Sequence, residues 1–120
     1  MKEKRRYPRM SFECMRAYIP ERRAFFEIQD ISLKGCFFPM EDPPPPGTIF
    51  NLELELPGVG RIPARGMVMH QGKPGSPGAG IYFLDIEGGF YCVLAKFLKA
   101  LRLIEDARKL YERILSSEEK

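Results

Sequence analysis

Hydrophobic and polar residues alternate along several short segments in the first two-thirds of the chain, a pattern typical of β-strands with one buried and one solvated face. The alternation is clearest over residues 50–56, where phenylalanine or leucine occupies every even position and polar residues occupy the odd ones. Further strands are expected at residues 11–19, 25–32, 36–40, 61–71 and 81–84. Short turns join these six segments, so the sequence predicts a small six-stranded antiparallel β-barrel, because closure removes unpaired sheet edges.

Glycine and proline mark the boundaries between the expected strands. Segments 25–32 and 36–40 are separated by a short connection and should pair as a hairpin. A proline and a glycine near the start of segment 61–71 predict an edge position or a bulge there. Residues 72–80 are rich in Gly and Pro and are expected to form a loop.

A long helix is expected after the strands. Residues 90–115 contain neither Gly nor Pro, and apolar residues recur there at spacings of three and four, which indicates an amphipathic helix. The first half carries a broad apolar face and is expected to cap the barrel. The second half is more charged, and it either projects into solvent or forms a partner surface. Self-association through residues 105–120 is one hypothesis, which sedimentation of the chain with and without them would test.

Length and cysteine content limit the class of protein. A chain of 120 residues forms one domain with one core, divided here into a basic arm (1–10), the barrel (11–87) and the helix (88–120). Its three cysteines are widely spaced, so reduced core thiols are expected and a disulfide framework is not. No segment has the apolar length of a membrane span or the pattern of a signal peptide, which predicts a cytoplasmic protein.

Positive charge is concentrated near the N-terminus. The chain contains 19 Lys+Arg and 16 Asp+Glu, of which residues 1–23 hold eight bases and three acids, leaving 11 bases and 13 acids for the rest. A nucleic-acid scaffold is usually more basic as a whole. The basic segment is therefore either a solvated leader or an anion-binding arm.

The sequence contains no motif of an enzyme or a metal site. GxSxG, P-loop and HExxH patterns are missing. The one histidine, His70, has no Cys, His or carboxylate at metal-ligand spacing and is expected to be structural. We therefore expect a binding protein without catalytic residues, metal or cofactor.

Two short motifs remain. The first is the arginine run in RRYPR, where Pro8 keeps the segment out of a helix interior and favours an extended conformation at Tyr7. The second, DISLKG, lies at the end of one expected strand and in the turn to the next. Asp, Ser and Gly are also ordinary hairpin residues, so the second motif alone does not indicate a binding site. Together with the arginine run, it does. Together they supply Arg5, Arg6, Arg9, Asp30, Ser32 and Gly35.

In this order the two motifs resemble the ligand signature of the PilZ family of cyclic di-GMP receptors, RxxxR followed by (D/N)xSxxG. Arg5 and Arg9 match the first half, Arg6 adds a third guanidinium, and 20 residues separate Arg9 from Asp30. The late segments GMVMHQ and AGIYFLDI also look like the family's, so the resemblance covers residues 4–100. It implies a mainly β split barrel that binds cyclic di-GMP and acts in bacterial motility, biofilm or exopolysaccharide control.

The residue types suit such a ligand on chemical grounds. Arginine can pair bidentately with a phosphate or with guanine O6 and N7, and it can stack on a base. Asp30 and Ser32 lie two apart on a strand and therefore point the same way, forming a wall that can accept from guanine N–H groups. Gly35 allows a turn conformation or a close backbone approach. Closure of the arm over this wall would give a conformational switch.

Partners are expected as well. A protein effector is expected, together with homo-oligomerisation through the helix as an option, and the ligand binds as one molecule or as a stacked pair. Two alternatives are a nucleotide-free adaptor of the same fold and a small RNA-binding barrel that uses the aromatic residues Phe25, Phe37 and Phe38, although nucleic acid is not the expected partner. Titration with cyclic di-GMP, GTP and single-stranded RNA would separate the three.

Overall fold

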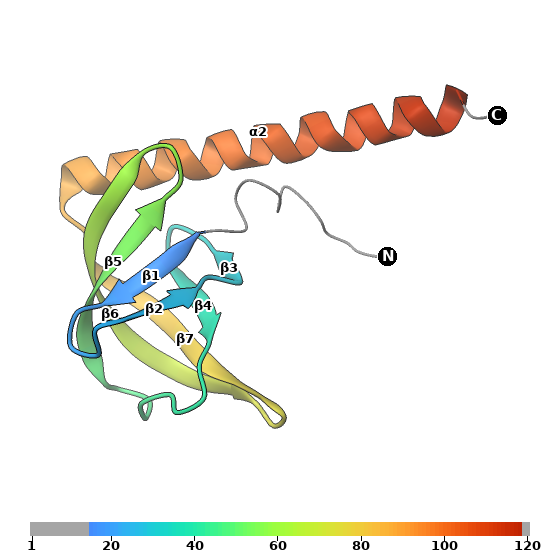
Figure 1. The fold of residues 1–120 in the computed structure, drawn as a ribbon. Helices are drawn as coiled ribbons and strands as arrows, with labels where there is room; N and C mark the ends of the chain where they lie inside the picture. Colours follow the sequence, from blue (N-terminus) through green and yellow to red (C-terminus); the bar gives the residue numbers. More distant parts are fainter. Residues whose placement is uncertain (1–14, 119–120) are drawn as a thin grey trace.

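The computed structural model describes residues 15–118 as seven β-strands and one long helix (Figure 1). The strands are β1 (Arg16–Ile19), β2 (Ala24–Glu27), β3 (Asp30–Ile31), β4 (Gly35–Pro39), β5 (Ile49–Leu56), β6 (Gly60–Lys73) and β7 (Ser76–Asp85), and the helix is α2 (Gly88–Glu118). The strands form one antiparallel sheet in the order β2-β1-β5-β6-β7-β4-β3. The predicted fold class, a mainly β split barrel with a C-terminal helix, is confirmed, with seven strands in place of six.

The two edge strands of this sheet are consecutive in the sequence. β2 pairs with β1, β3 pairs with β4, and only two residues lie between β2 and β3. The Ile28 N–H donates to the Met15 carbonyl (2.9 Å), and the Gln29 N–H donates to the Phe37 carbonyl (2.8 Å). One segment thus joins both ends of the sheet, which curls into the split barrel. The single strand expected over residues 25–32 is therefore two strands, and only the second pairs with β4.

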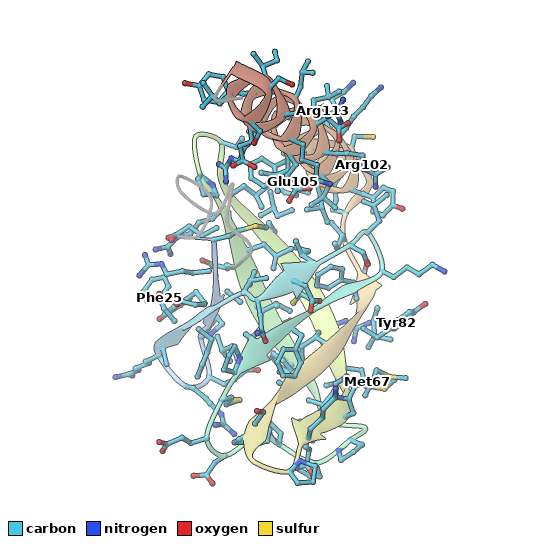
Figure 2. All side chains as sticks on the ribbon, turned by 90° about the vertical axis from the view of Figure 1, so that its right-hand side faces the viewer. Phe25, Met67, Tyr82, Arg102, Glu105 and Arg113 are labelled. Atoms are coloured by element: carbon cyan, nitrogen blue, oxygen red, sulfur yellow. The ribbon has the colours of Figure 1, made fainter. Side chains whose placement is uncertain are left out.

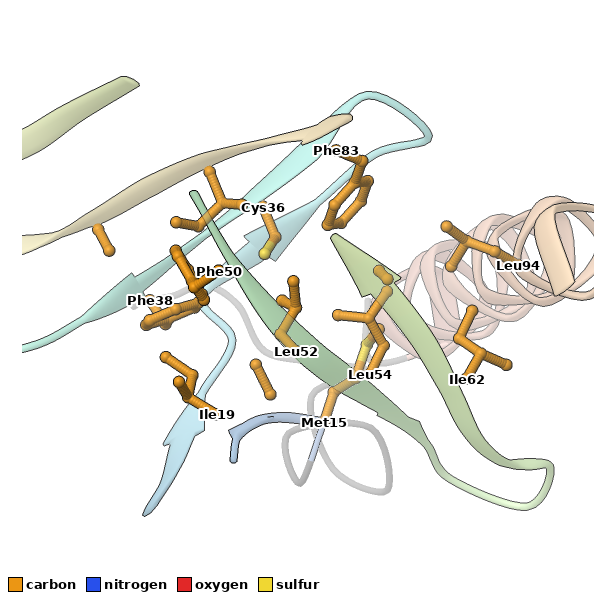
Figure 3. Packing of buried hydrophobic residues seen from close by; sticks show 14 of the residues in the cluster. Met15, Ile19, Cys36, Phe38, Phe50, Leu52, Leu54, Ile62, Phe83 and Leu94 are labelled. Carbon is orange, nitrogen blue, oxygen red and sulfur yellow. The ribbon is translucent and has the colours of Figure 1, made fainter. Parts of the chain in front are cut away.

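Alternation in β5 sorts its side chains between the two faces, as predicted. Its leucines are buried in the core (Figure 3). On the outer face, Arg61 lies 3.2 Å from Glu53 and 3.4 Å from Glu55, and Arg16 Nε lies 2.8 Å from Glu55. The hydrogen bond from Arg16, reinforced by the charges of both arginines, holds the pKa of Glu55 below its ordinary value.

The segment expected to be a loop, residues 72–80, instead belongs to a hairpin between β6 and β7. The strands pair as far as Lys73 and Ser76, which leaves Pro74 and Gly75 as a two-residue turn. Gly75 has φ 84°, a conformation that glycine adopts without steric cost. The loop prediction was wrong because the glycines here permit a tight turn and close packing without interrupting the pairing of the strands.

β6 is an interior strand, so the edge position considered for residues 61–71 is wrong. A register shift between Arg65 and Gly66 confirms the bulge that was the other expectation. Pro63 pairs with β5 but with no residue of β7, whose pairing with β6 begins at Arg65. A missing N–H at Pro63 therefore costs no bond to β7.

α2 begins with a side-chain cap. The Glu87 carboxylate accepts hydrogen bonds from the N–H groups of Gly89 (3.1 Å) and Phe90 (3.3 Å). These donors have no partner within a helix, so the carboxylate stabilises its first turn. None of the described helical segments is long and apolar enough to cross a membrane.

The two halves of α2 have different surroundings. In the first half, Leu94 and Phe97 are buried in the barrel core, and Figure 3 shows Leu94 beside Ile62. The predicted capping of the barrel is thereby confirmed. Beyond Leu101 the helix extends past the barrel (Figure 1), and its large apolar side chains are exposed.

Candidate ligand-binding site

An open groove of about 720 Å³ lies on the outer face of the sheet, between the β3–β4 turn and the β6–β7 hairpin. Its volume falls within the range, roughly 300–1,000 Å³, that is common for small-molecule sites. The side chains that define it include Asp30, Ser32, Lys34, Phe37, His70 and Lys73. The groove thus combines charged, hydroxyl and aromatic groups.

Asp30 and Ser32 both line the groove, as expected for residues two apart on an extended segment. Asp30 begins β3 and pairs with Phe37 of β4. The Ser32 N–H donates to the Gly35 carbonyl (2.8 Å), and Ser32 Oγ accepts from the Lys34 N–H (3.1 Å). Ser32 therefore stabilises the tight turn beside the aspartate.

Gly35 lies where β4 meets β7. It pairs with Tyr82, and a Cβ at this position would overlap the carbonyl oxygen of Ile81 and lie 3.3 Å from the Tyr82 Cα. Gly35 has no positive φ. Of the two roles expected for this glycine, close backbone approach applies and a left-handed turn does not.

Two aromatic rings lie over glycines of β7 on the floor of the groove. A Cβ on Gly80 would fall within 2.6 Å of three atoms of the His70 imidazole, so this ring covers Gly80 face-on, and a Cβ on Gly78 would overlap the Phe37 ring. The two ring centroids are 5.8 Å apart and the ring planes differ by 15°. The Gly72 N–H donates to His70 Nδ1 at 3.1 Å. The floor is therefore flat and aromatic.

Asp30 supplies the negative charge of the groove, and two lysines supply positive charge. Within residues 15–118, no side chain forms an ion pair with the Asp30 carboxylate or donates a hydrogen bond to it. Burial, reinforced by the charge of Asp30, raises the pKa of the neighbouring Cys36 thiol to about 12. Cys36 is therefore a neutral core thiol, whereas the aspartate has a carboxylate available to a ligand.

The other two cysteines were also expected in the core. Cys92 lies on α2 and is exposed, so the expectation is wrong there, because the residue falls on the helix face turned away from the barrel. Cys14 lies outside the described residues.

The arginine half of the expected site lies outside the described residues and comprises Arg5, Arg6 and Arg9. The first described residue is Met15, which is buried. Its carbonyl is hydrogen-bonded to the Ile28 N–H, two residues before Asp30. The arm is thus attached to the barrel close to the groove wall.

The two residues of the groove floor were not predicted as site residues. His70 was expected to be structural, and Phe37 was a candidate only for RNA binding. The alternation in β4 places Phe37 on the opposite face of the sheet from the buried Cys36 and Phe38. That His70 lies beside Phe37 depends on the register of β6, β7 and β4, which the sequence pattern does not give.

The aromatic residues considered for RNA binding do not share a surface. Phe38 is buried in the core, and Phe25 lies on the opposite side of the barrel from Tyr82, a residue of the groove (Figure 2). Phe37 alone of the three lines the groove. In the part of the chain that the structure describes, no three potential metal ligands lie together.

Comparison with known families decides the assignment. The model of the PilZ domain matches residues 3–99 of the 120, a range that includes both motifs and the whole barrel. The chain belongs to the PilZ domain family. A comparison with curated proteins found no match.

PilZ domains form a family of cyclic di-GMP receptors. In this PilZ chain the matched range ends after the buried first half of α2. The exposed part of α2 beyond Leu101 lies outside the matched range.

Proposed function

We propose that this PilZ domain binds cyclic di-GMP in the groove, between the wall formed by Asp30, Ser32 and Gly35 and the arm that carries the N-terminal arginines. The observation that carries the proposal is the meeting of all three wall residues at one side of a large open groove. The arginines assigned to the ligand are Arg5, Arg6 and Arg9.

The attachment point of the arm supports this arrangement. The chain enters the barrel at Met15, which is hydrogen-bonded to Ile28 and thus close to Asp30. Arg9 precedes Met15 by six residues, and an extended chain spans at most about 3.3–3.6 Å per residue. The Cα of Arg9 can therefore lie up to roughly 20 Å from Met15.

The chemistry of the two sides is complementary to the ligand. A cyclic dinucleotide has two phosphates and two guanines, which arginine can contact through bidentate hydrogen bonds and by stacking. The Asp30 carboxylate accepts hydrogen bonds from guanine N–H groups. Ser32 and Gly35 keep the turn tight, so that the wall is rigid while the arm closes over the ligand.

Closure of the arm changes the surface offered to other proteins. The signal then leaves the domain through a protein effector in the cytoplasm, in pathways such as motility, biofilm or exopolysaccharide control. One ligand molecule or a stacked pair would satisfy this mechanism, since each presents phosphates to the arginines.

We assign a second interaction surface to the distal stripe of α2, the exposed apolar side chains beyond residue 101. They are 40–63% exposed and comprise Leu103, Ile104, Leu110, Tyr111, Ile114 and Leu115. A contiguous apolar surface of this kind marks an interaction site. Residues 102–118 hold four bases and four acids, so the flanks of the stripe can pair with a second copy of themselves. The occupant that we propose is therefore the α2 helix of a second chain.

Calorimetric titration tests the receptor function. Cyclic di-GMP should saturate the protein, and Asp30→Ala should weaken binding by about 10- to 100-fold because a hydrogen bond to a charged group is lost. Asp106→Ala on α2 is the matched control and should bind like the parent.

Competing functions give different results in the same experiment. Titrations with GTP and with single-stranded RNA at two salt concentrations accompany the cyclic dinucleotide. Binding of RNA that weakens steeply with salt would favour an RNA-binding barrel. No binding of any of the three would favour a nucleotide-free adaptor.

A further inference from the structure

We propose that His70 and Phe37 form an aromatic shelf on which one guanine of the bound dinucleotide stacks, with Asp30 at the edge of the shelf. The inference rests on the proposed function and extends it to two residues outside the arginine and DISLKG motifs. It assigns one base of the ligand to the aromatic floor of the groove.

The flatness of the shelf comes from β7. Gly78 and Gly80 are two apart on this strand, so they face the same side of the sheet. The His70 imidazole covers Gly80 face-on, and the Phe37 ring lies over Gly78, in a plane only 15° from that of the imidazole. A side chain at either glycine would occupy the space of the ring above it. The two rings therefore lie in nearly parallel planes over neighbouring outward-facing positions of the strand.

The upper faces of these rings are open to the groove. Both residues line it, His70 is exposed, and Phe37 is half-buried. Nucleobases bind proteins by stacking on planar aromatic side chains. With 5.8 Å between the centroids, the shelf presents two adjacent rings, which a bicyclic purine can cover together.

Asp30 is placed to read the edge of a base on this shelf. It pairs directly with Phe37 in the β3–β4 ladder, and directly paired residues have Cβ atoms only about 4.5–5.5 Å apart. A guanine stacked on Phe37 can direct its N1–H and N2–H groups toward the carboxylate, which accepts both. Adenine lacks this pair of donors, so shelf and carboxylate together select guanine.

The imidazole is held in its orientation by the backbone. The Gly72 N–H donates to His70 Nδ1 at 3.1 Å, which orients the ring. This bond and the Phe37 contact fix an exposed side chain before the ligand arrives. A preorganised ring loses less conformational entropy when a base stacks on it.

A purely structural role for the two rings makes a different prediction. If the two rings only bridge β6 and β4, they contribute to folding stability alone. The affinity for the ligand would then not depend on whether the bridging side chains are aromatic. Variants at His70 separate the two roles, because planarity matters for stacking and bulk alone suffices for a bridge.

The test measures the dissociation constant of cyclic di-GMP by calorimetry for the parent, His70→Ala, His70→Leu and His70→Phe. Loss of one stacked base should weaken the affinity of the alanine and leucine variants by about 5- to 100-fold. The planar ring of the phenylalanine variant should keep the affinity within about threefold of the parent's, because it preserves the stacking contact. Phe25→Ala removes an exposed aromatic side chain away from the groove and should leave binding unchanged.

A second measurement uses the native chain. The protein has one histidine, so an untagged sample gives a single set of imidazole proton signals by NMR. Stacking of a guanine should shift them upfield on saturation, and this result does not depend on whether any variant folds.

The outcomes distinguish the shelf from the receptor function. If the parent does not bind cyclic di-GMP, both proposals fail. If the parent binds while His70→Ala binds equally well, or the imidazole signals stay in place at saturation, the shelf is overturned and the receptor function stands.

Discussion

The backbone of Gly35 lies so close to the carbonyl oxygen of Ile81 that any Cβ at position 35 would overlap that oxygen. The neighbouring Lys34 carbonyl accepts from the Phe83 N–H at 2.8 Å, which holds the two strands together at this point. The last residue of the DISLKG motif therefore joins the turn to β7. Contact between β4 and β7 is what brings the wall of the groove and its aromatic floor together.

Gly35→Ala should destabilise the fold and displace the turn. Insertion of one methyl group against a packed backbone costs typically about 1–3 kcal/mol. Urea unfolding followed by circular dichroism measures the free energy of unfolding. Gly88→Ala, at a position where a Cβ would meet nothing within 4 Å, is the control and should be no less stable than the parent. Equal stability of the Gly35 variant would contradict the close approach.

Arg9→Ala should weaken binding of cyclic di-GMP. Loss of one bidentate contact costs about 1–3 kcal/mol, or roughly one to two decades in the dissociation constant. Calorimetry provides the measurement, and Arg22→Ala removes the same charge from an exposed turn as a control. Identical affinities for Arg9→Ala and the parent would remove this arginine from the site.

The distal stripe of α2 should hold two or more chains together. Leu110→Glu places a charge in the stripe, whereas Lys109→Glu alters the neighbouring polar face. Sedimentation should show a smaller assembly for the first variant and the parent's assembly for the second. Deletion of residues 105–120 should also reduce the number of chains in the assembly. The barrel should stay folded, because residues 105–117 contain no buried side chain. A monomeric parent at micromolar concentration would contradict self-association.

The buried Cys36 thiol should make the protein less stable at alkaline pH. Its pKa is about 12 in the fold against an ordinary 9.0, so the unfolded chain releases this proton first. The stabilisation is complete below pH 9 and falls as pH rises toward 12, by about 2 kcal/mol at pH 10.5. Urea unfolding at pH 8 and pH 10.5 should show this loss in the parent and not in Cys36→Ala.

Thiol accessibility provides an independent check of the same residue. Alkylation of the folded protein at pH 8 should modify the exposed Cys92 and spare Cys36. Rapid modification of Cys36 under native conditions would contradict its burial.

The strands and the helix could be predicted where one face of each element is buried. β5 shows this most clearly, since a buried leucine at every second position is legible without its neighbours. The hairpin tip at Gly75 was missed because the same glycines and prolines suit a loop and a tight turn, and only pairing between β6 and β7 distinguishes them. The split of segment 25–32 was missed for a similar reason, because the change of partner from β1 to β4 leaves no mark in the hydrophobic pattern.

By itself, the sequence determined the fold class, the packing of the first half of the long helix on the barrel, and the motif residues Asp30, Ser32 and Gly35. It could do so because alternation, helical periodicity and short motifs are local properties of the chain. The tertiary structure decided that Gly35 is required by β7 and that His70 lies flat on Gly80 beside Phe37. These contacts join residues far apart in the sequence. They depend on strand register, which pairing across the whole sheet sets and no single segment encodes.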